Sequence, residues 1–277
     1  MSLDGCGTTT QRHSPPRDGV TRSTVVHPYD VGVASTPPRI KFCGITSLDD
    51  AQLAVDAGAW AIGLILWDGS PRACALPEAE RIAAHFRRQV EVCGVFVNAT
   101  LDEVAATVDG VGLTMIQLHG DEGPSFCEEA RRRTGARVIK AKRIHSNADM
   151  LDLDRYHSDF HLLDAYKRGV PGGTGETFDW DLASKRLTTT IPLILSGGLT
   201  PENVAAGIAA TEPYAVDVAS GTESSPGVKD PAKLIAFAEA VRATVPPPEE
   251  PETPAPLHPE PAAADLGVQA PVRTPRS

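Results

Sequence analysis

Two reactive side chains stand at the ends of apolar runs in this sequence. Cys43 lies near the end of RIKFCGI (39–45), and Asp164 near the end of DFHLLDA (159–165). A thiol acts as a base or nucleophile only as its thiolate, which a nearby cation would favour. A carboxyl group in a partly apolar setting can serve as a general acid. The pair can supply both proton transfers of one reaction, although Cys43 can also be a core residue and Asp164 a loop cap.

Three glycine-rich stretches come late in the chain, each after an apolar run. They are GGTGETF (172–178), SGGLTPENV (196–204) and SGTESSPGVKD (220–230). Glycine lets backbone N–H groups approach an anion closely, and helix N-termini add a favourable dipole. A Gly-Gly pair can also mark no more than a turn. The pattern predicts a phosphate site formed by Gly173, Gly175, Gly197, Gly198, Ser220 and Gly221.

Further polar residues lie on or just after other apolar runs, and they are candidates for binding a substrate. Arg72, in the segment SPR, can pair with a carboxylate. Gln117 and His119 point the same way from MIQLH, and Asp217 points inward from AVDVAS. Alternatively, His119 can have a structural role, and Asp217 can be a hydrogen-bonded group of the core. Asn98 follows the third run and can cap a loop there.

Eight apolar runs supply the strands that must position these side chains. They cover residues 39–45, 60–66, 90–97, 115–119, 137–144, 159–165, 191–197 and 215–220. Near-continuous runs are typical of strands buried on both faces of a parallel sheet. Because side chains alternate along a strand, Lys41 and Cys43 share one face, and Ile40 and Phe42 share the other. We expect the apolar pair to pack under helices and the polar pair to point inward.

Amphipathic stretches separate the runs and predict helices. They cover residues 47–58, 76–88, 100–108, 123–133, 149–157, 179–186, 200–210 and 230–245. Several begin with Ser, Thr or Asp and end near glycine, as helices do. Eight strand–helix units in about 200 residues predict a single (β/α)₈ TIM barrel, with its site at the C-terminal ends of the strands. A doubly wound sheet is the alternative, but Gly44 alone does not make its glycine-rich fingerprint.

Composition sets the limits of this domain. Residues 1–38 are rich in Ser, Thr, Pro and Gly, and residues 246–277 begin PPPEEPETPAPLHPEPAAA. Neither segment has the apolar surface to build a core. We therefore expect a disordered leader at 1–38, a catalytic barrel at 39–245 and a disordered Pro-rich tail at 246–277.

Charge and cysteine usage exclude several classes of protein. The net charge of −10 leaves no basic face for nucleic acid, and the basic run at 131–133 falls at the end of a predicted helix, where cations favour the dipole. No apolar run is long enough to span a membrane, and no apolar signal segment opens the chain. The five cysteines are an odd number without Cys-x-x-Cys spacing. That usage argues against disulfides or a zinc site and favours a cytoplasmic protein.

Seven motifs occur in the order typical of one known family. They are KFCGIT, GLIL…SPR, GVFVN, QLHGDE, LLDAY…GGTG…FDW, LSGGLTPENV and VDVASGTE…PGVKD. They cover nearly all of residues 39–245, and the chain resembles the phosphoribosylanthranilate isomerase family of tryptophan biosynthesis. The resemblance implies that Cys43 is the general base and Asp164 the general acid. It also implies that Arg72 contacts an anthranilate carboxylate, although SPRAC lacks an aromatic residue usual there.

The resemblance implies an Amadori rearrangement, the third step from chorismate to tryptophan. N-(5-phosphoribosyl)anthranilate becomes 1-(2-carboxyphenylamino)-1-deoxyribulose 5-phosphate, without a metal or organic cofactor. The implied partner is this small phosphoribosyl substrate, and the implied assembly is a monomer or homodimer. Two alternatives stay open. The first is a related barrel enzyme that isomerises a histidine-pathway aminoimidazole ribotide, but such enzymes usually have Asp where Cys43 stands. The second is a phosphate-binding protein without activity, which would not need both Cys43 and Asp164.

Overall fold

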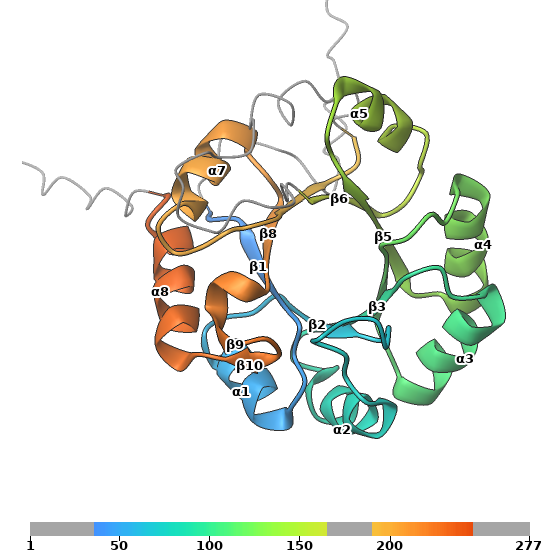
Figure 1. Cartoon of the computed structure of the whole chain (residues 1–277), viewed down its shortest axis with the longest axis horizontal. Coiled ribbons are helices and arrows are strands. Elements are labelled where there is room, and N and C mark those ends of the chain that lie inside the picture. The colour runs from blue at the N-terminus through green and yellow to red at the C-terminus, as the bar shows by residue number, and fades with distance from the viewer. Residues whose placement is uncertain (1–35, 165–189, 246–277) are drawn as a thin grey trace, which may run out of the picture. The chain divides into compact units, whose positions relative to one another are not determined.

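The chain forms a closed barrel of eight parallel strands, in a computed structural model that describes residues 36–164 and 190–245. Figure 1 looks down this barrel, with the strands as an inner ring and the helices outside it. Each strand pairs with the next one along the chain, and β8 (Ala215–Val218) closes the ring on β1 (Arg39–Cys43). A doubly wound sheet would keep two free edges, so the closure confirms the predicted barrel.

The other strands and the helices lie close to where the sequence predicts them. The strands are β2 (Ala61–Ile65), β3 (Glu91–Phe96), β4 (Met115–Leu118), β5 (Arg137–Arg143), β6 (Phe160–Asp164) and β7 (Leu193–Ser196). The described helices are α1 (Leu48–Asp56), α2 (Leu76–Phe86), α3 (Leu101–Val111), α4 (Pro124–Thr134), α5 (Asn147–Leu153), α7 (Val204–Thr211) and α8 (Pro231–Arg242). The helix predicted at 179–186 lies outside the described residues. None of the described helices is long and apolar enough to cross a membrane.

One segment differs from its prediction. The stretch 220–230 is predicted only as a glycine-rich loop, but it forms a short 3₁₀ turn, η1 (Ser220–Thr222), and then an antiparallel pair. The strands of this pair are β9 (Glu223–Ser225) and β10 (Val228–Lys229). They are too short to show a periodic pattern in the sequence, because alternation needs at least about four residues to be recognised.

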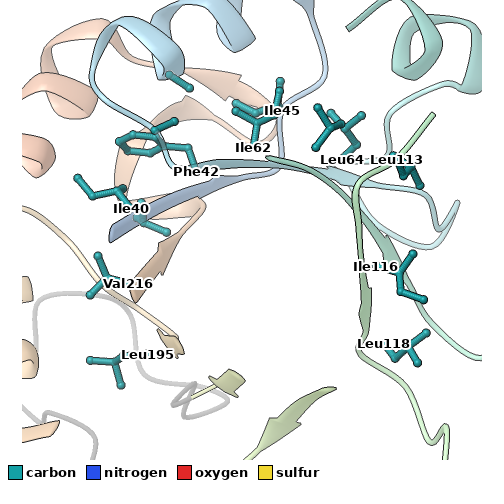
Figure 2. Close-up of a cluster of buried hydrophobic side chains, with 14 of the residues drawn as sticks. Ile40, Phe42, Ile45, Ile62, Leu64, Leu113, Ile116, Leu118, Leu195 and Val216 are labelled. Atoms are coloured by element: carbon teal, nitrogen blue, oxygen red, sulfur yellow. The ribbon is translucent and has the colours of Figure 1, made fainter. Parts of the chain in front are cut away.

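Strand alternation divides the core into an outer and an inner part. Figure 2 shows the outer part, in which side chains from the strands point toward the helices; it includes Ile40, Phe42, Ile62, Leu64, Ile116, Leu118, Leu195 and Val216. A smaller cluster fills the inside of the barrel with Cys93, Met115, Ile139, Ala141, Phe160, Leu162, Ile194 and Ala215. On β1, Ile40 and Phe42 belong to the outer part, while Lys41 and Cys43 point inward, as predicted.

Short-range contacts set several helix ends. The Thr100 hydroxyl and the Glu103 carboxylate form a capping box that begins α3, and the Asp230 carboxylate accepts hydrogen bonds from two N–H groups at the start of α8. Gly112 and Gly135 end α3 and α4 in the left-handed conformation that glycine adopts without steric cost.

Aromatic rings gather at the end of the barrel where the strands begin. Trp60, Phe160 and Tyr214 have ring centroids 5.5–5.6 Å apart, and the Arg39 guanidinium lies 4.9 Å from the centre of the Tyr214 ring. Edge-to-face rings and an overlying cation each favour association beyond simple burial. This packing fills the N-terminal end of the barrel, so an open site belongs at the other end.

Candidate active site

A cavity of about 950 Å³ lies at the C-terminal ends of the strands. Every strand of the barrel contributes to its lining, at or close to its C-terminal end; examples in strand order are Cys43, Ile65, Val95, Gln117, Ala141, Asp164, Ser196 and Asp217. The volume is in the usual range for a small-molecule site, and the position is the one that this fold uses for function.

Nine of the twelve site residues predicted from the sequence line this cavity. They are Cys43, Arg72, Gln117, His119, Asp164, Gly197, Gly198, Asp217 and Ser220. Gly173 and Gly175 lie outside the described residues. Gly221 is not among the lining residues, and a Cβ atom there would lie 1.9 Å from the Leu199 carbonyl oxygen. A side chain at this position would push apart the loops that follow β7 and β8.

A buried cation lies beneath the cavity floor. Lys41 is 0% exposed, and its Nζ donates hydrogen bonds to Asp217 Oδ1 at 2.7 Å and Gln117 Oε1 at 2.9 Å. Asp217 Oδ2 also accepts a hydrogen bond from Ser196 Oγ at 3.0 Å. Burial by itself lowers the pKa of Lys41, but the attraction of Asp217 and of the nearby thiols outweighs burial and raises it. Lys41 therefore carries its charge inside the barrel.

Cys43 is subject to opposing electrostatic effects. Burial raises the pKa of its thiol and the Asp217 carboxylate raises it further, whereas Lys41 and Lys229 lower it. The net pKa is above that of an ordinary thiol, so the group is protonated at neutral pH. A nearby cation lowers the pKa of the Cys43 thiol, as expected, but burial has the larger effect.

Polar contacts join this buried centre to Asp164. The Gln117 side-chain nitrogen lies 3.3 Å from His119 Nδ1, and His119 Nε2 lies 3.4 Å from Asp164 Oδ2. Because the Gln117 side-chain nitrogen is a donor, Nδ1 accepts and the ring proton is on Nε2, which lies near Asp164 without a hydrogen bond to it. The Asp164 side chain is 14% exposed, and Arg143 Nε lies 3.7 Å from it. Asp164 is therefore only slightly exposed and lies beside a histidine and an arginine.

Arg72 is held in place by a carboxylate from the hairpin formed by β9 and β10. Its Nε donates to Glu223 Oε1 at 2.8 Å, and its Nη2 donates to Glu223 Oε2 at 2.8 Å. Such paired hydrogen bonds fix the plane of a guanidinium. Within the described part of the chain, Arg72 Nη1 donates no hydrogen bond, and Arg72 lines the cavity. This nitrogen is available to a carboxylate of a bound molecule.

The same hairpin is attached to the floor of the site by Lys229. Its buried Nζ donates to the Cys43 carbonyl oxygen at 2.7 Å and the Ala219 carbonyl oxygen at 3.0 Å, and it lies 3.5 Å from Glu223 Oε1. Glu223 and Lys229 were not predicted as site residues. They are charged residues on either side of a Pro-Gly turn, a sequence pattern that is also common on protein surfaces.

The loop after β7 contains two glycines in left-handed conformations. Gly197 and Gly198 have φ angles of +96° and +64°, which a residue with a side chain rarely adopts. Asn203 closes the loop, since its Oδ1 accepts from the Thr200 N–H at 2.8 Å and its Nδ2 donates to the Gly198 carbonyl at 3.0 Å. Together with Ser220 of η1, these glycines line one side of the cavity.

Asn98 caps a loop, as the sequence suggested. Its side-chain oxygen accepts a hydrogen bond from the Asp121 N–H at 2.6 Å, and its own N–H donates to Glu122 at 2.8 Å. Its φ angle of +54° is left-handed, a conformation that asparagine tolerates better than most residues. Asn98 also lines the cavity wall, but its polar atoms are engaged within the loop.

The arrangement suits acid–base chemistry on a ligand with two anionic groups. A thiol lies at the end of β1 and a carboxyl at the end of β6, on nearly opposite sides of the ring of strands. A glycine-rich loop and a fixed arginine line the same space. Among residues 36–164 and 190–245, no three His, Cys, Asp or Glu side chains are grouped so that they could hold a metal ion.

Comparison with known proteins places the whole barrel in one family. Residues 40–240 match the family model described as N-(5'phosphoribosyl)anthranilate (PRA) isomerase. The N-(5'-phosphoribosyl)anthranilate isomerase of Pseudomonas fluorescens is 48% identical over 206 residues, which is 74% of this chain and 95% of that protein. The enzyme of the same name from Citrifermentans bemidjiense is 46% identical over 198 residues, or 71% of this chain and 93% of that protein.

Solved structures agree with these relatives. Phosphoribosyl anthranilate isomerase from Thermotoga maritima superposes with a TM-score of 0.67 at 37% identity, covering 74% of this chain and 99% of the other. A second structure shows monomers generated from the Thermotoga maritima enzyme, which is described there as dimeric. It superposes with a TM-score of 0.66 at 35% identity and has the same coverage. A third holds a phosphoribosyl anthranilate isomerase in complex with reduced 1-(o-carboxyphenylamino)-1-deoxyribulose 5-phosphate; its TM-score is 0.65 at 35% identity, again with 74% and 99% coverage. Because these matches extend across the entire barrel, this chain belongs to the N-(5'-phosphoribosyl)anthranilate isomerase family.

Proposed function

We propose that this chain converts N-(5'-phosphoribosyl)anthranilate to 1-(2-carboxyphenylamino)-1-deoxyribulose 5-phosphate, with Cys43 as general base and Asp164 as general acid. One observation carries the assignment of roles: a thiol from β1 and a carboxyl from β6 line one cavity of about 950 Å³. A related enzyme of this family has been crystallised with the reduced form of that product. The conversion is a step of tryptophan biosynthesis.

Two anion sites position the substrate in this proposal. The phosphate is held by the loops after β7 and β8, where Gly197, Gly198 and Ser220 line the cavity. The anthranilate carboxylate accepts a hydrogen bond from Arg72 Nη1, while Glu223 keeps the guanidinium in plane. Gly173, Gly175 and Gly221 remain predictions for the phosphate site. Anchors at both ends hold the ribose between Cys43 and Asp164, and such positioning supplies much of a rate enhancement.

The acid acts first. Asp164 donates its proton to the furanose ring oxygen, and the bond between C1′ and that oxygen breaks, with its electron pair staying on oxygen. The nitrogen lone pair forms a double bond to C1′, which gives an iminium cation. His119 Nε2, 3.4 Å from Asp164 Oδ2, lies beside the carboxyl group. A general acid in this position contributes about 10²–10⁴-fold to the rate.

The base acts second. The iminium cation makes the hydrogen on C2′ acidic, and the Cys43 thiolate removes it as a proton. The C–H electron pair becomes the C1′–C2′ double bond, and the electrons of the C=N bond return to nitrogen. Return of a proton to C1′ and loss of the proton on O2′ complete the ketone. Hydrogen moves within one molecule, so the reaction needs no external oxidant or reductant.

Cys43→Ser and Asp164→Asn test these roles. Each variant is expected to lower kcat by about 10²–10⁴-fold. Binding of the reduced product analogue should change little, because the phosphate and carboxylate anchors remain. Cys127→Ser is the matched control, since Cys127 is a buried thiol on α4 outside the barrel and should leave kcat unchanged. Near-normal turnover by Cys43→Ser would mean that another group is the base, and lost analogue binding in Asp164→Asn would mean that Asp164 mainly shapes the site.

Two finer points belong to the same proposal. Cysteine usage favours the cytoplasm as the site of action. The assembly is a monomer or a homodimer, and one family member from Thermotoga maritima is described as dimeric. Analytical ultracentrifugation of the full chain distinguishes the two assemblies by mass. Assay with an aminoimidazole ribotide in parallel tests the rival substrate.

A further inference from the structure

Lys41 has no contact with the cavity, yet it is a neighbour of the Cys43 sulfur. It is 0% exposed and is absent from the cavity lining, so a substrate bound there cannot touch it. Gly63 of β2 lies opposite Cys43 in the strand register. A Cβ atom at Gly63 would lie 2.8 Å from Cys43 Sγ and 3.1 Å from Lys41 Nζ. The ammonium group and the sulfur therefore lie side by side above this glycine.

Several charged or titratable groups face Cys43 from the surrounding elements. They are Lys41 on its own strand, Asp217 on β8, Lys229 on β10, Arg72 in the loop after β2, and Cys93 on β3. The two cations from outside β1 are turned to other partners. Arg72 is paired with Glu223, and Lys229 donates to the Cys43 carbonyl oxygen. Of these cations, Lys41 attracts a negative charge on the sulfur most strongly.

We propose that Lys41 is a positioning residue of the reaction: its ammonium group, fixed by Asp217 and Gln117 beneath the cavity, stabilises the negative charge on Cys43 when that residue acts as a base. Attraction between opposite charges is far stronger in the interior than in water. Asp217 keeps Lys41 protonated through a 2.7 Å hydrogen bond and prevents it from turning away. Without Lys41, the thiolate would face the Asp217 carboxylate with no cation between them.

This role has a kinetic consequence, which rests on the proposed function of Cys43 as the base. Because Lys41 does not touch the substrate, its loss should lower kcat and leave the affinity for the reduced product analogue nearly unchanged. It also has a chemical consequence that does not depend on turnover. The rate at which iodoacetamide alkylates Cys43 follows the fraction of thiolate, so it reports the effect of Lys41 directly.

The test compares the parent protein with the double variant Lys41→Met/Asp217→Asn. The double variant lacks both members of the buried ion pair, so it leaves neither a cation nor a carboxylate unpaired. Alkylation of the Cys43 peptide is followed by mass spectrometry from neutral to strongly alkaline pH. The double variant is expected to be alkylated about tenfold more slowly at neutral pH. The midpoint of its alkylation rate against pH should lie about one pH unit higher, since one pKa unit changes the thiolate fraction about tenfold. In the single variant Lys41→Met, kcat should fall by a similar factor.

A matched control separates this effect from the loss of any buried ion pair. Lys140 and Glu122 form such a pair at 3.0 Å, with both side chains 3% exposed. Lys140→Met/Glu122→Gln should leave Cys43 alkylation as in the parent. Equal alkylation rates in the parent and in Lys41→Met/Asp217→Asn would overturn the proposal for Lys41, whatever the turnover. If the parent protein fails to convert the substrate while the two proteins still differ in alkylation rate, the proposed function is wrong and the electrostatic role of Lys41 stands.

Discussion

At Cys43, burial and charge act in opposite directions, and burial has the larger effect. The thiolate is the form that removes a proton, but the pKa of this thiol lies above that of an ordinary cysteine. Two buried cations, Lys41 and Lys229, reduce the cost of ionisation without abolishing it. The iminium charge of the reacting substrate would add a third positive charge next to the sulfur, at the moment when the thiolate is needed.

The raised pKa predicts how activity depends on pH. Because the active thiolate is lost as pH falls below the pKa, kcat/KM should rise with pH through the neutral range and into the alkaline range. A pH–rate profile of the full chain measures this, with Cys43→Ser as the control that should lack the rising limb. A value of kcat/KM that is constant from neutral to alkaline pH would contradict a protonated resting thiol.

Glu223 accepts three hydrogen bonds from Arg72, so the charge of Glu223 should matter for binding. Glu223→Gln keeps the shape of the side chain but weakens the pair, and Arg72→Ala removes the cation altogether. We expect Arg72→Ala to weaken binding of the product analogue by about 1.5–3 kcal/mol, with a smaller loss for Glu223→Gln. The dissociation constant is read by calorimetry.

The control for that prediction is a similar pair away from the site. Glu129 accepts two hydrogen bonds from an arginine, Arg132, but both lie on the exposed face of α4. Glu129→Gln should leave analogue binding unchanged. Equal affinities for Glu223→Gln, Arg72→Ala and the parent would make Arg72 a structural residue only.

Among the elements, the pairing of β1 with β2 controls the space around the proposed base. Cys43 lies opposite Gly63, and no side chain larger than hydrogen fits between these two residues. The hairpin of β9 and β10 controls the other side, because it carries both Glu223 and Lys229. Two short segments far apart in the sequence thus enclose one thiol.

Gly63→Ala should therefore disturb the site and the core together. The added methyl group would lie 2.8 Å from Cys43 Sγ, closer than van der Waals contact allows. Overpacking of this kind costs about 1–3 kcal/mol, so a lower melting temperature and a lower kcat are expected. Thermal denaturation and steady-state kinetics measure the two effects.

Gly110→Ala provides the opposite case. Gly110 lies in α3, and a Cβ atom there would meet no other atom within 4 Å. Replacing a helical glycine with alanine stabilises by about 0.4–1 kcal/mol, so this variant should melt higher and turn over normally. If both alanine variants behaved alike, crowding at Cys43 would not explain the effect of Gly63→Ala.

On the scale of the whole molecule, the two ends of the barrel have different tasks. Aromatic rings and Arg39 fill the end where the strands begin, and the cavity occupies the end where they finish. This division is general in barrels of this type, with stability at one end and chemistry at the other. It lets the loops of the cavity vary without loss of the packed core.

The composition of the terminal segments leads to a further prediction. We propose that residues 1–38 and 246–277 contribute no core to the barrel, since they are rich in Pro, Ser, Thr and small residues. A shortened chain of residues 39–245 should keep the melting temperature and kcat/KM of the full chain. Calorimetry and steady-state assays on both chains measure this, and a large loss of either property would show that a terminal segment docks on the barrel.

Periodicity along the chain is enough to predict the barrel and the face on which each strand residue lies. Eight apolar runs set the order of the strands, and strand alternation placed Lys41 and Cys43 inside and Ile40 and Phe42 outside. Because parallel strands in a barrel all end at the same face, the positions of Cys43 and Asp164 near strand ends were enough to bring them to one cavity. These features depend on local periodicity, which a single sequence contains.

The groups that come within bonding distance of one another could not be predicted, because they are set by how distant segments pack. Lys41 and Asp217 are 176 positions apart and meet because β8 closes on β1, while Arg72 and Glu223 are 151 positions apart and meet through a hairpin too short to be predicted. The pKa of Cys43 depended on this assembly as well, since the cation beside it was visible in the sequence but the burial that outweighs it was not. Desolvation and long-range hydrogen bonds arise from contacts among distant segments, and periodicity along the chain carries no record of them.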